Sequence, residues 1–393
     1  MLGRRTLLLL IILLSLFGPI STDMFLSALP DMVTEFGTTE AVMSMIMYLF
    51  MLSLAVSVLI LGPLSDKYGR RIVLSASLIV YIATSFLCCL ATDVWTLIAL
   101  RVVQAVGGAG SICISMALIK DCFKGREMGQ ALSITAALGI LGPILAPIVG
   151  TVLINALDWR ATFWAPALIA LLCLVLTMGI PRELPLERYQ GTIAGSLGNL
   201  VSLVRDRDFT AFAVMMTVFS LTLLAYISVS SYIYQETFGL SSTHYSMCLA
   251  ATMIAGILLA TLIKRIGERR GNLFMVGSFL VLGLLCFLML SLIAPIHWAL
   301  FLASMIPCTA IPTMTRSFGF GILLNQREND SGAISSVLNF GTFGFACIGM
   351  VIATLPWPSF IVGLSACALL CCTVFAVLWV YVRNRGYRIK GLV

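Results

Sequence analysis

Three charged residues lie inside long apolar stretches of the sequence: Asp23, Arg101 and Arg316. A charge surrounded by apolar side chains is costly unless it is paired or serves a function. Burial raises the pKa of a carboxyl group and a nearby cation lowers it, so a buried acid whose surroundings change can bind and release a proton. The three residues therefore indicate a path for an ion or a substrate.

The apolar stretches around these charges are long enough to cross a membrane. Of the 393 residues, 60% are apolar and 10% are charged, whereas soluble domains are about 45–50% apolar. A helix needs about 20 residues to cross the hydrocarbon core, and strands of a membrane barrel would be only about 10 residues long. The sequence therefore predicts an all-α membrane protein with twelve transmembrane helices, near residues 7–29, 41–63, 72–91, 94–119, 129–154, 161–180, 209–235, 243–264, 272–293, 297–324, 331–354 and 357–381.

The distribution of basic residues predicts the orientation. If both termini are cytoplasmic, Arg160 is the one base among the 24 Lys and Arg that falls in an outer loop. Arg101 and Arg316 lie inside spans, and the remaining bases lie on the inner side, as the positive-inside rule requires. The net charge of +7 thus reflects topology, and we expect lipid but no nucleic acid as a partner.

The chain divides once. The longest polar connection covers residues 181–208 and predicts a cytoplasmic linker between two six-helix halves, 1–180 and 209–393. The loop GPLSDKYGRRI in the first half is echoed by TLIKRIGERRG in the second, which aligns Gly69 with Gly267. Tandem halves of this kind are typical of transporters in which one half moves against the other.

The loop between the second and third spans resembles the signature of the major facilitator superfamily. Gly62, Asp66, Gly69, Arg70 and Arg71 fall on the motif positions. Glycines allow helix ends to approach, and the acid and bases can form charge-assisted bonds that hold the cytoplasmic side together. The alternative, an ordinary basic loop, explains the arginines but not their spacing.

Two further motifs match the same superfamily. RVVQAVGGAG in the fourth span places Arg101, Gln104 and Gly107 on family positions, with alanine at 105 where the family has glycine. LGILGPILAPIVG in the fifth span resembles the antiporter motif of the superfamily. Its small residues allow helices to pack closely, and its prolines bend the helix. The motif positions are Gly139, Gly142, Pro143, Pro147 and Gly150.

The first span contains TDMFLSALPDM, which resembles the first-helix signature of twelve-helix drug:proton antiporters of the bicyclomycin and chloramphenicol-resistance type. The resemblance implies a proton-coupled antiporter that exports small hydrophobic or amphipathic compounds by alternating access. It also implies a monomer in the cytoplasmic (inner) membrane, without a cofactor other than the coupling protons. Alternatives are a dedicated transporter of one metabolite, such as a siderophore-like exporter or a nutrient symporter, and a membrane protein that transports nothing.

We expect Asp23 to carry the proton and Arg101 to modulate it. Counted along their spans, both residues lie on the order of 10 Å below the outer surface, so they could share one cavity. The alternatives are a permanent ion pair between them, which would only fix helix packing, and an Asp23 that stays hydrated near the surface.

The predicted substrate cavity draws on polar and aromatic side chains in several spans: Gln104, Tyr226, Tyr232, Arg316 and Asn339. Arg316 either meets anionic substrates or extends to lipid headgroups. The amides and tyrosines have a simpler alternative in interhelical packing and the interfacial aromatic belt.

Enzyme activity is not expected. The sequence contains no phosphate-binding Gly-x-x-x-x-Gly-Lys loop, no His-Glu-x-x-His zinc motif and no Gly-x-Ser-x-Gly nucleophile elbow. The twelve cysteines contain no Cys-x-x-Cys pair, and the helical spacing of those at 367, 371 and 372 favours buried small side chains over a metal site. Energy is therefore expected to come from an ion or substrate gradient.

Overall fold

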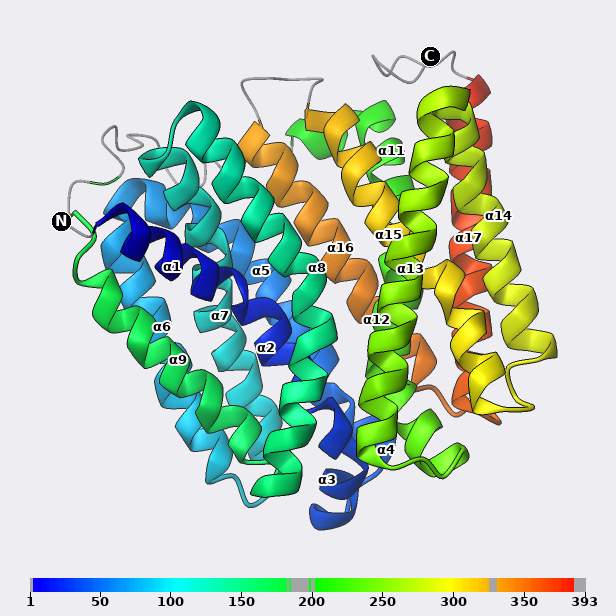
Figure 1. Ribbon diagram of the computed structural model, residues 1–393, viewed down its shortest axis with the longest axis horizontal. Helices are drawn as coiled ribbons and strands as arrows, with labels where there is room; N and C mark the ends of the chain where they lie inside the picture. The colour runs from blue at the N-terminus through cyan, green and yellow to red at the C-terminus, as the bar shows by residue number, and fades with distance from the viewer. Residues whose placement is uncertain (1–2, 182–183, 185–197, 199–201, 325–330, 385–393) are drawn as a thin grey trace. The chain divides into compact units, whose positions relative to one another are not determined.

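The computed structural model describes residues 3–181, 184, 198, 202–324 and 331–384, and these residues contain helices but no strand. The chain divides into two compact units, Met1–Leu197 and Gly198–Val393 (Figure 1). The predicted linker at 181–208 lies largely outside the described residues.

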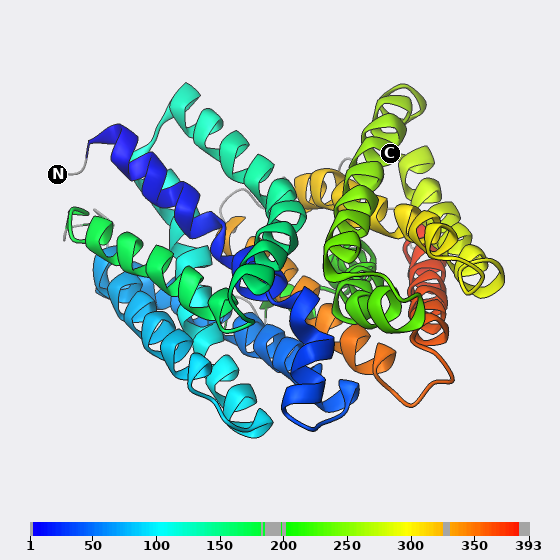
Figure 2. The same cartoon turned by 60° about the horizontal axis from the view of Figure 1, so that its bottom comes forward.

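The helices of the first unit lie in the regions of the predicted spans, with bounds that differ by several residues. Asp93 begins one of them by accepting a hydrogen bond from the Thr96 backbone amide at 2.8 Å, and Gly69, at φ +103°, separates two others. Helices α6 and α7 lie side by side in both views of the unit (Figures 1 and 2). The α-helices are α1 (Arg4–Ser15), α2 (Phe17–Asp23), α3 (Leu29–Glu35), α4 (Glu40–Met43), α5 (Met45–Tyr68), α6 (Arg70–Cys89), α7 (Val94–Cys122), α8 (Gly125–Ala156) and α9 (Ala161–Thr177).

The first span is longer than predicted, and it is broken. It runs from Arg4 to Glu35 as α1, α2, a 3-10 turn at Leu26–Ala28 and α3. Pro19 and Pro30 supply no backbone N–H, so the helical hydrogen-bond pattern is interrupted near each of them. The helical segment that contains Asp23 therefore continues to Glu35 rather than ending at residue 29.

The second unit is built from α11 (Arg207–Thr217), α12 (Ser220–Tyr232), a π-helical turn (Ile233–Thr237), α13 (Ser242–Arg270), α14 (Asn272–Leu292), α15 (Trp298–Leu324), α16 (Ser331–Ala353) and α17 (Phe360–Asn384). Gly271, at φ +87°, separates α13 from α14 as Gly69 separates α5 from α6. Aligning Gly69 with Gly267 was therefore wrong by one helical turn, because only the position between the helices requires positive φ.

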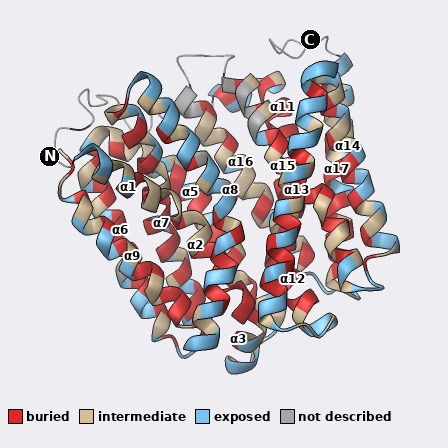
Figure 3. Ribbon diagram, viewed as in Figure 1, coloured by how far each residue is buried: buried red, intermediate tan, exposed pale blue. Residues whose placement is uncertain are grey.

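Ten helical segments in the described residues are long and apolar enough to cross a membrane. Helix α8 adds an eleventh if its two parts, which are bent by 47°, form one span, and α9 is a shorter apolar helix. The bend fits Pro143, whose ring clashes with the carbonyl four residues earlier. Exposed apolar side chains follow helices such as α13 (Figure 3). The chain is thus a multi-pass membrane protein, whereas twelve spans and cytoplasmic termini stay predictions.

Candidate functional site

The broken first span is clamped by two glycines of α8. A Cβ atom added to Gly142 would lie 2.6 Å from Pro19 Cγ, and one added to Gly150 would overlap the backbone carbonyl of Met24. Both distances are shorter than side chains tolerate, so only glycine permits this approach. The antiporter-like motif of the fifth span therefore packs on either side of Asp23.

Asp23 is the last residue of α2, and its side chain is 5% exposed. No Lys or Arg among the described residues lies within ion-pair distance of its carboxyl group. A permanent ion pair with Arg101 is thus not present in this conformation.

Arg101 is buried at 1% exposure, yet it is stabilised without a carboxylate. Nη1 donates to Gln104 Oε1 at 2.6 Å, and Nη2 donates to the backbone carbonyl of Ser21 at 2.9 Å. The guanidinium carbon lies 4.1 Å from the ring centre of Phe50 and 4.7 Å from that of Phe25. Hydrogen bonds and cation–π contacts together offset the cost of burying the charge.

A polar network extends from Arg101 across three helices. Gln104 Nε2 donates to Ser85 Oγ at 2.6 Å, and Ser85 Oγ donates to the carbonyl of Tyr81 at 2.7 Å. The Tyr81 hydroxyl in turn shares a hydrogen bond of 2.6 Å with Ser21 Oγ. Gln104, predicted to line a cavity, is 1% exposed and bonded on both sides of its amide. The network joins the span of Asp23 to the helices at 70–122.

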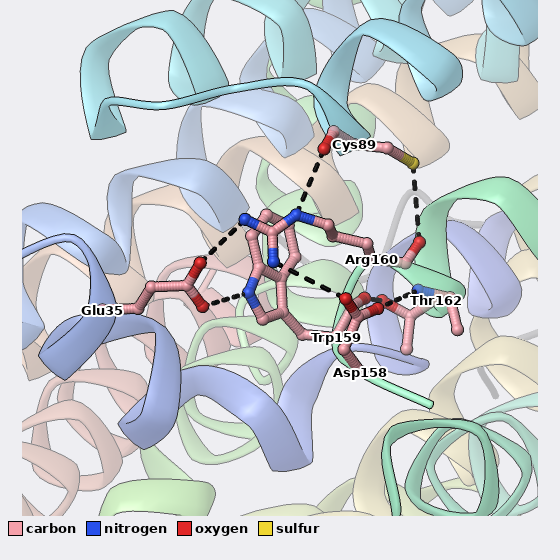
Figure 4. Close-up of polar contacts among 7 residues, drawn as sticks. Glu35, Cys89, Asp158, Trp159, Arg160 and Thr162 are labelled. Atoms are coloured by element: carbon pink, nitrogen blue, oxygen red, sulfur yellow. Dashed lines mark hydrogen bonds and ion pairs between the residues drawn. The ribbon is translucent and has the colours of Figure 1, made fainter. Parts of the chain in front are cut away.

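A second cluster lies at the end of the first span (Figure 4). Glu35 Oε1 accepts from Arg160 Nη2 at 2.8 Å, and Glu35 Oε2 accepts from Trp159 Nε1 at 2.5 Å. Arg160 Nε also donates to the Cys89 carbonyl at 3.2 Å, and Nη1 lies 3.6 Å from Asp158. The cluster ties α3 to the loop before α9 and to the end of α6.

An aromatic column connects this cluster with Arg101. Trp159 meets Phe163 edge-on, with ring centres 5.8 Å apart, and Phe163 stacks on Phe25 at 5.8 Å. Phe25 lies against the Arg101 guanidinium. A continuous series of packed aromatic rings therefore links the Glu35–Arg160 cluster to Arg101.

Arg70 is the centre of the loop motif in the first unit. It is 7% exposed, and it forms ion pairs with Asp66 and, at 2.8 Å, with Asp121 at the end of α7. Its Nη1 also donates to Ser65 Oγ at 2.6 Å. These pairs hold the ends of α5, α6 and α7 together within this unit.

The other motif positions behave differently. Arg71 Nη1 donates to the Ile180 carbonyl at 3.4 Å. A Cβ atom at Gly62 would meet nothing within 4 Å, so the structure shows no close approach at that glycine. Gly69 is explained by its positive φ.

In the second unit, the two predicted cavity tyrosines are fully buried. Tyr226 donates to Thr252 Oγ1 at 3.3 Å and packs edge-on against Phe301, while Tyr232 stacks on Phe360. Neither ring faces open space in this conformation.

The two remaining predicted residues of the second unit are less covered. Asn339 is half-buried on α16, and Arg316 is exposed on α15. The structure therefore separates the five predicted cavity residues into three buried and two accessible ones, and their roles stay predictions.

Sequence reasoning did not single out Glu35 or Asp121, although a signal for each was present. Arg160 was the one base expected in the outer loops, and Glu35 was among the acids there, so their pairing could have been anticipated. Asp121 lies in IKDCF at the same predicted side as Arg70. The roles of Phe25 and Phe163 had no such signal, because apolar rings are common in every span.

The geometry defines a multi-pass membrane protein of two helical units with buried charges in the first. Residues 11–326 match the family model of the Major Facilitator Superfamily, and the chain belongs to this family. It is 24% identical over 372 residues to the multidrug resistance protein MdtL of Escherichia coli O157:H7, with 91% of each chain covered. It is 25% identical over 364 residues to the chloramphenicol resistance protein CraA of Acinetobacter baumannii, covering 90% of this chain and 84% of that protein.

Solved structures agree on the fold. The crystal structure of the peptide transporter POT superimposes with a TM-score of 0.76 at 14% identity, covering 99% of this chain and 97% of the other. Family membership supports a transporter of small molecules rather than an enzyme.

Proposed function

We propose that the chain is a proton-coupled antiporter that exports small hydrophobic or amphipathic compounds by alternating access. In this proposal it is a monomer of twelve spans in the bacterial cytoplasmic membrane, with both termini inside. The relatives named for multidrug and chloramphenicol resistance support the export of such compounds.

The observation that carries the coupling is the buried Asp23 without a cation partner. In a low-dielectric environment an unpaired carboxyl group is favoured in its neutral form, and hydration favours the anion. A conformational change that hydrates Asp23 would therefore release a proton, and one that buries it would take a proton up. Arg101 binds the backbone carbonyl of Ser21, two residues before Asp23, and would modulate this balance.

The test is proton flux in proteoliposomes loaded with a pH dye. Chloramphenicol and ethidium are added in turn to the wild type and to Asp23→Asn, Asp23→Glu and Asp31→Asn. Asp31 is a matched control because it is an exposed acid of the same sequence stretch. Each preparation is shown to be folded by its melting temperature.

We expect compound-triggered proton movement in the wild type and Asp31→Asn, none in Asp23→Asn, and partial activity in Asp23→Glu. Undiminished flux in Asp23→Asn would remove Asp23 from the mechanism. Absence of flux with every compound in folded wild-type protein would refute proton coupling.

A further inference from the structure

Arg316 is an exposed charge on α15 that directly follows a long covered stretch of the helix. Every residue from Phe301 to Thr315 of α15 is buried or half-buried. Helix α13 shows what a lipid-facing surface looks like, with Ile254, Leu258 and Leu262 exposed by 47%, 66% and 56%. Helix α15 has no such stripe of exposed apolar side chains between Phe301 and Thr315.

The exposure at Arg316 is therefore local. A lipid-facing stripe repeats every three or four residues along a helix, but Pro312 and Thr313, one turn earlier on the same side, are half-buried. Arg316 lies about two turns before the end of α15 at Leu324. Arg316 is thus accessible where the preceding residues of the helix are covered.

Arg316 has no counter-charge in the described part of the chain. It makes neither a hydrogen bond nor an ion pair there, and no aromatic ring lies under its guanidinium. The two buried arginines of the first unit, by contrast, are compensated, Arg70 by two carboxylates and Arg101 by hydrogen bonds and rings. An accessible guanidinium that the described residues leave without a counter-charge is free to bind an anion from elsewhere.

We propose that Arg316 binds the anionic group of a transported amphipathic compound, a carboxylate, sulfonate or phosphate. The planar guanidinium fork matches these groups, which it binds through two parallel hydrogen bonds. The proposal rests on the proposed export function and adds amphipathic anions to its substrate class. A lipid headgroup carries the same chemistry, so the test separates the two sources.

The experiment compares an anionic and a neutral compound in the full-length protein. Efflux of taurocholate, a sulfonate, and of chloramphenicol, which is neutral, is measured in proteoliposomes for the wild type, Arg316→Gln and Arg316→Lys. Arg265→Gln is the matched control, because Arg265 is an exposed arginine near the end of α13. All four proteins are studied in vesicles of phosphatidylcholine alone and of phosphatidylcholine with phosphatidylglycerol.

We expect Arg316→Gln to lose taurocholate efflux by about tenfold or more, as removal of a charge-assisted bond predicts. Chloramphenicol efflux should stay within about twofold of wild type, and Arg316→Lys should keep part of the taurocholate efflux. In detergent, taurocholate should raise the melting temperature of the wild type and of Arg265→Gln more than that of Arg316→Gln.

Three results would overturn the proposal. If the wild type neither transports taurocholate nor is stabilised by it, the proposal is wrong, while the proposed export of chloramphenicol is unaffected. An equal loss for both compounds in Arg316→Gln would return Arg316 to a general structural role. A loss seen only in vesicles with phosphatidylglycerol would assign the arginine to lipid headgroups.

Discussion

Replacing Gly150 by alanine tests whether the packing of α8 on the first span is as tight as the structure shows. The added Cβ atom would lie 2.6 Å from the carbonyl carbon of Met24 and 2.9 Å from its Cα atom, and it would overlap the carbonyl oxygen. These are backbone atoms of the residue next to Asp23, so no side chain can rotate away. Either α8 or the break in the first span must move.

The size of the effect follows from this geometry. Overfilling a well-packed interior costs about 1–3 kcal/mol, and the gain in helix propensity from glycine to alanine offsets at most about 1 kcal/mol. For a unit of roughly 200 residues, 1 kcal/mol shifts the melting temperature by about 2–4 °C. We therefore expect Gly150→Ala to melt about 5 °C below the wild type.

The measurement is the melting temperature of purified protein in detergent, with Gly129→Ala as the control. Gly129 lies in the same helix, but a Cβ atom there would meet nothing within 4 Å, so its replacement should not lower the melting temperature. If Gly150→Ala and Gly129→Ala had the same melting temperature, α8 would not contact Met24 as described. The close packing of α8 on the segment around Asp23 would then be refuted.

Two ion pairs of the first unit give further expectations. Glu35→Gln should lower the melting temperature by no more than about 4 °C, because the Glu35 and Arg160 side chains are 43% and 35% exposed and such pairs contribute about 1 kcal/mol or less. A fall of about 8 °C or more would show that the cluster is a structural anchor. Asp121→Asn should destabilise more than Asp66→Asn, because Arg70 is buried and its Asp121 partner is 19% exposed against 44% for Asp66. The reverse order in melting temperature would contradict this reasoning.

The helices could be predicted from the sequence because crossing a membrane demands long apolar runs, and such runs are visible without knowledge of packing. The breaks were harder to predict. The first span remains apolar through the break at Met24 and Phe25, so composition does not reveal it. Only Pro19 and Pro30 hinted at an interruption, and prolines also occur in continuous membrane helices such as α15.

The candidate site was predictable as a set of charges but not as a set of contacts. Depth along the membrane suggested that Asp23 and Arg101 could meet, yet depth does not say which side of a helix a residue occupies. Arg101 instead points to a carbonyl group and to Phe25 and Phe50. In the sequence those rings are indistinguishable from lipid-facing side chains.

The segment around Asp23 is held by contacts that do not involve its carboxyl group. Helix α8 packs on Pro19 and on the backbone of Met24, and Arg101 binds the Ser21 carbonyl. These three contacts fix the backbone on both sides of Asp23 and leave the acid itself without a cation partner. The proposed proton exchange at Asp23 would need this combination, because a rigid backbone keeps the position of the group while a carboxyl group without a cation partner can respond to hydration. A movement of α8 or α7 would reach the backbone beside Asp23 through these contacts, and under the proposed function it would thereby change proton binding at Asp23.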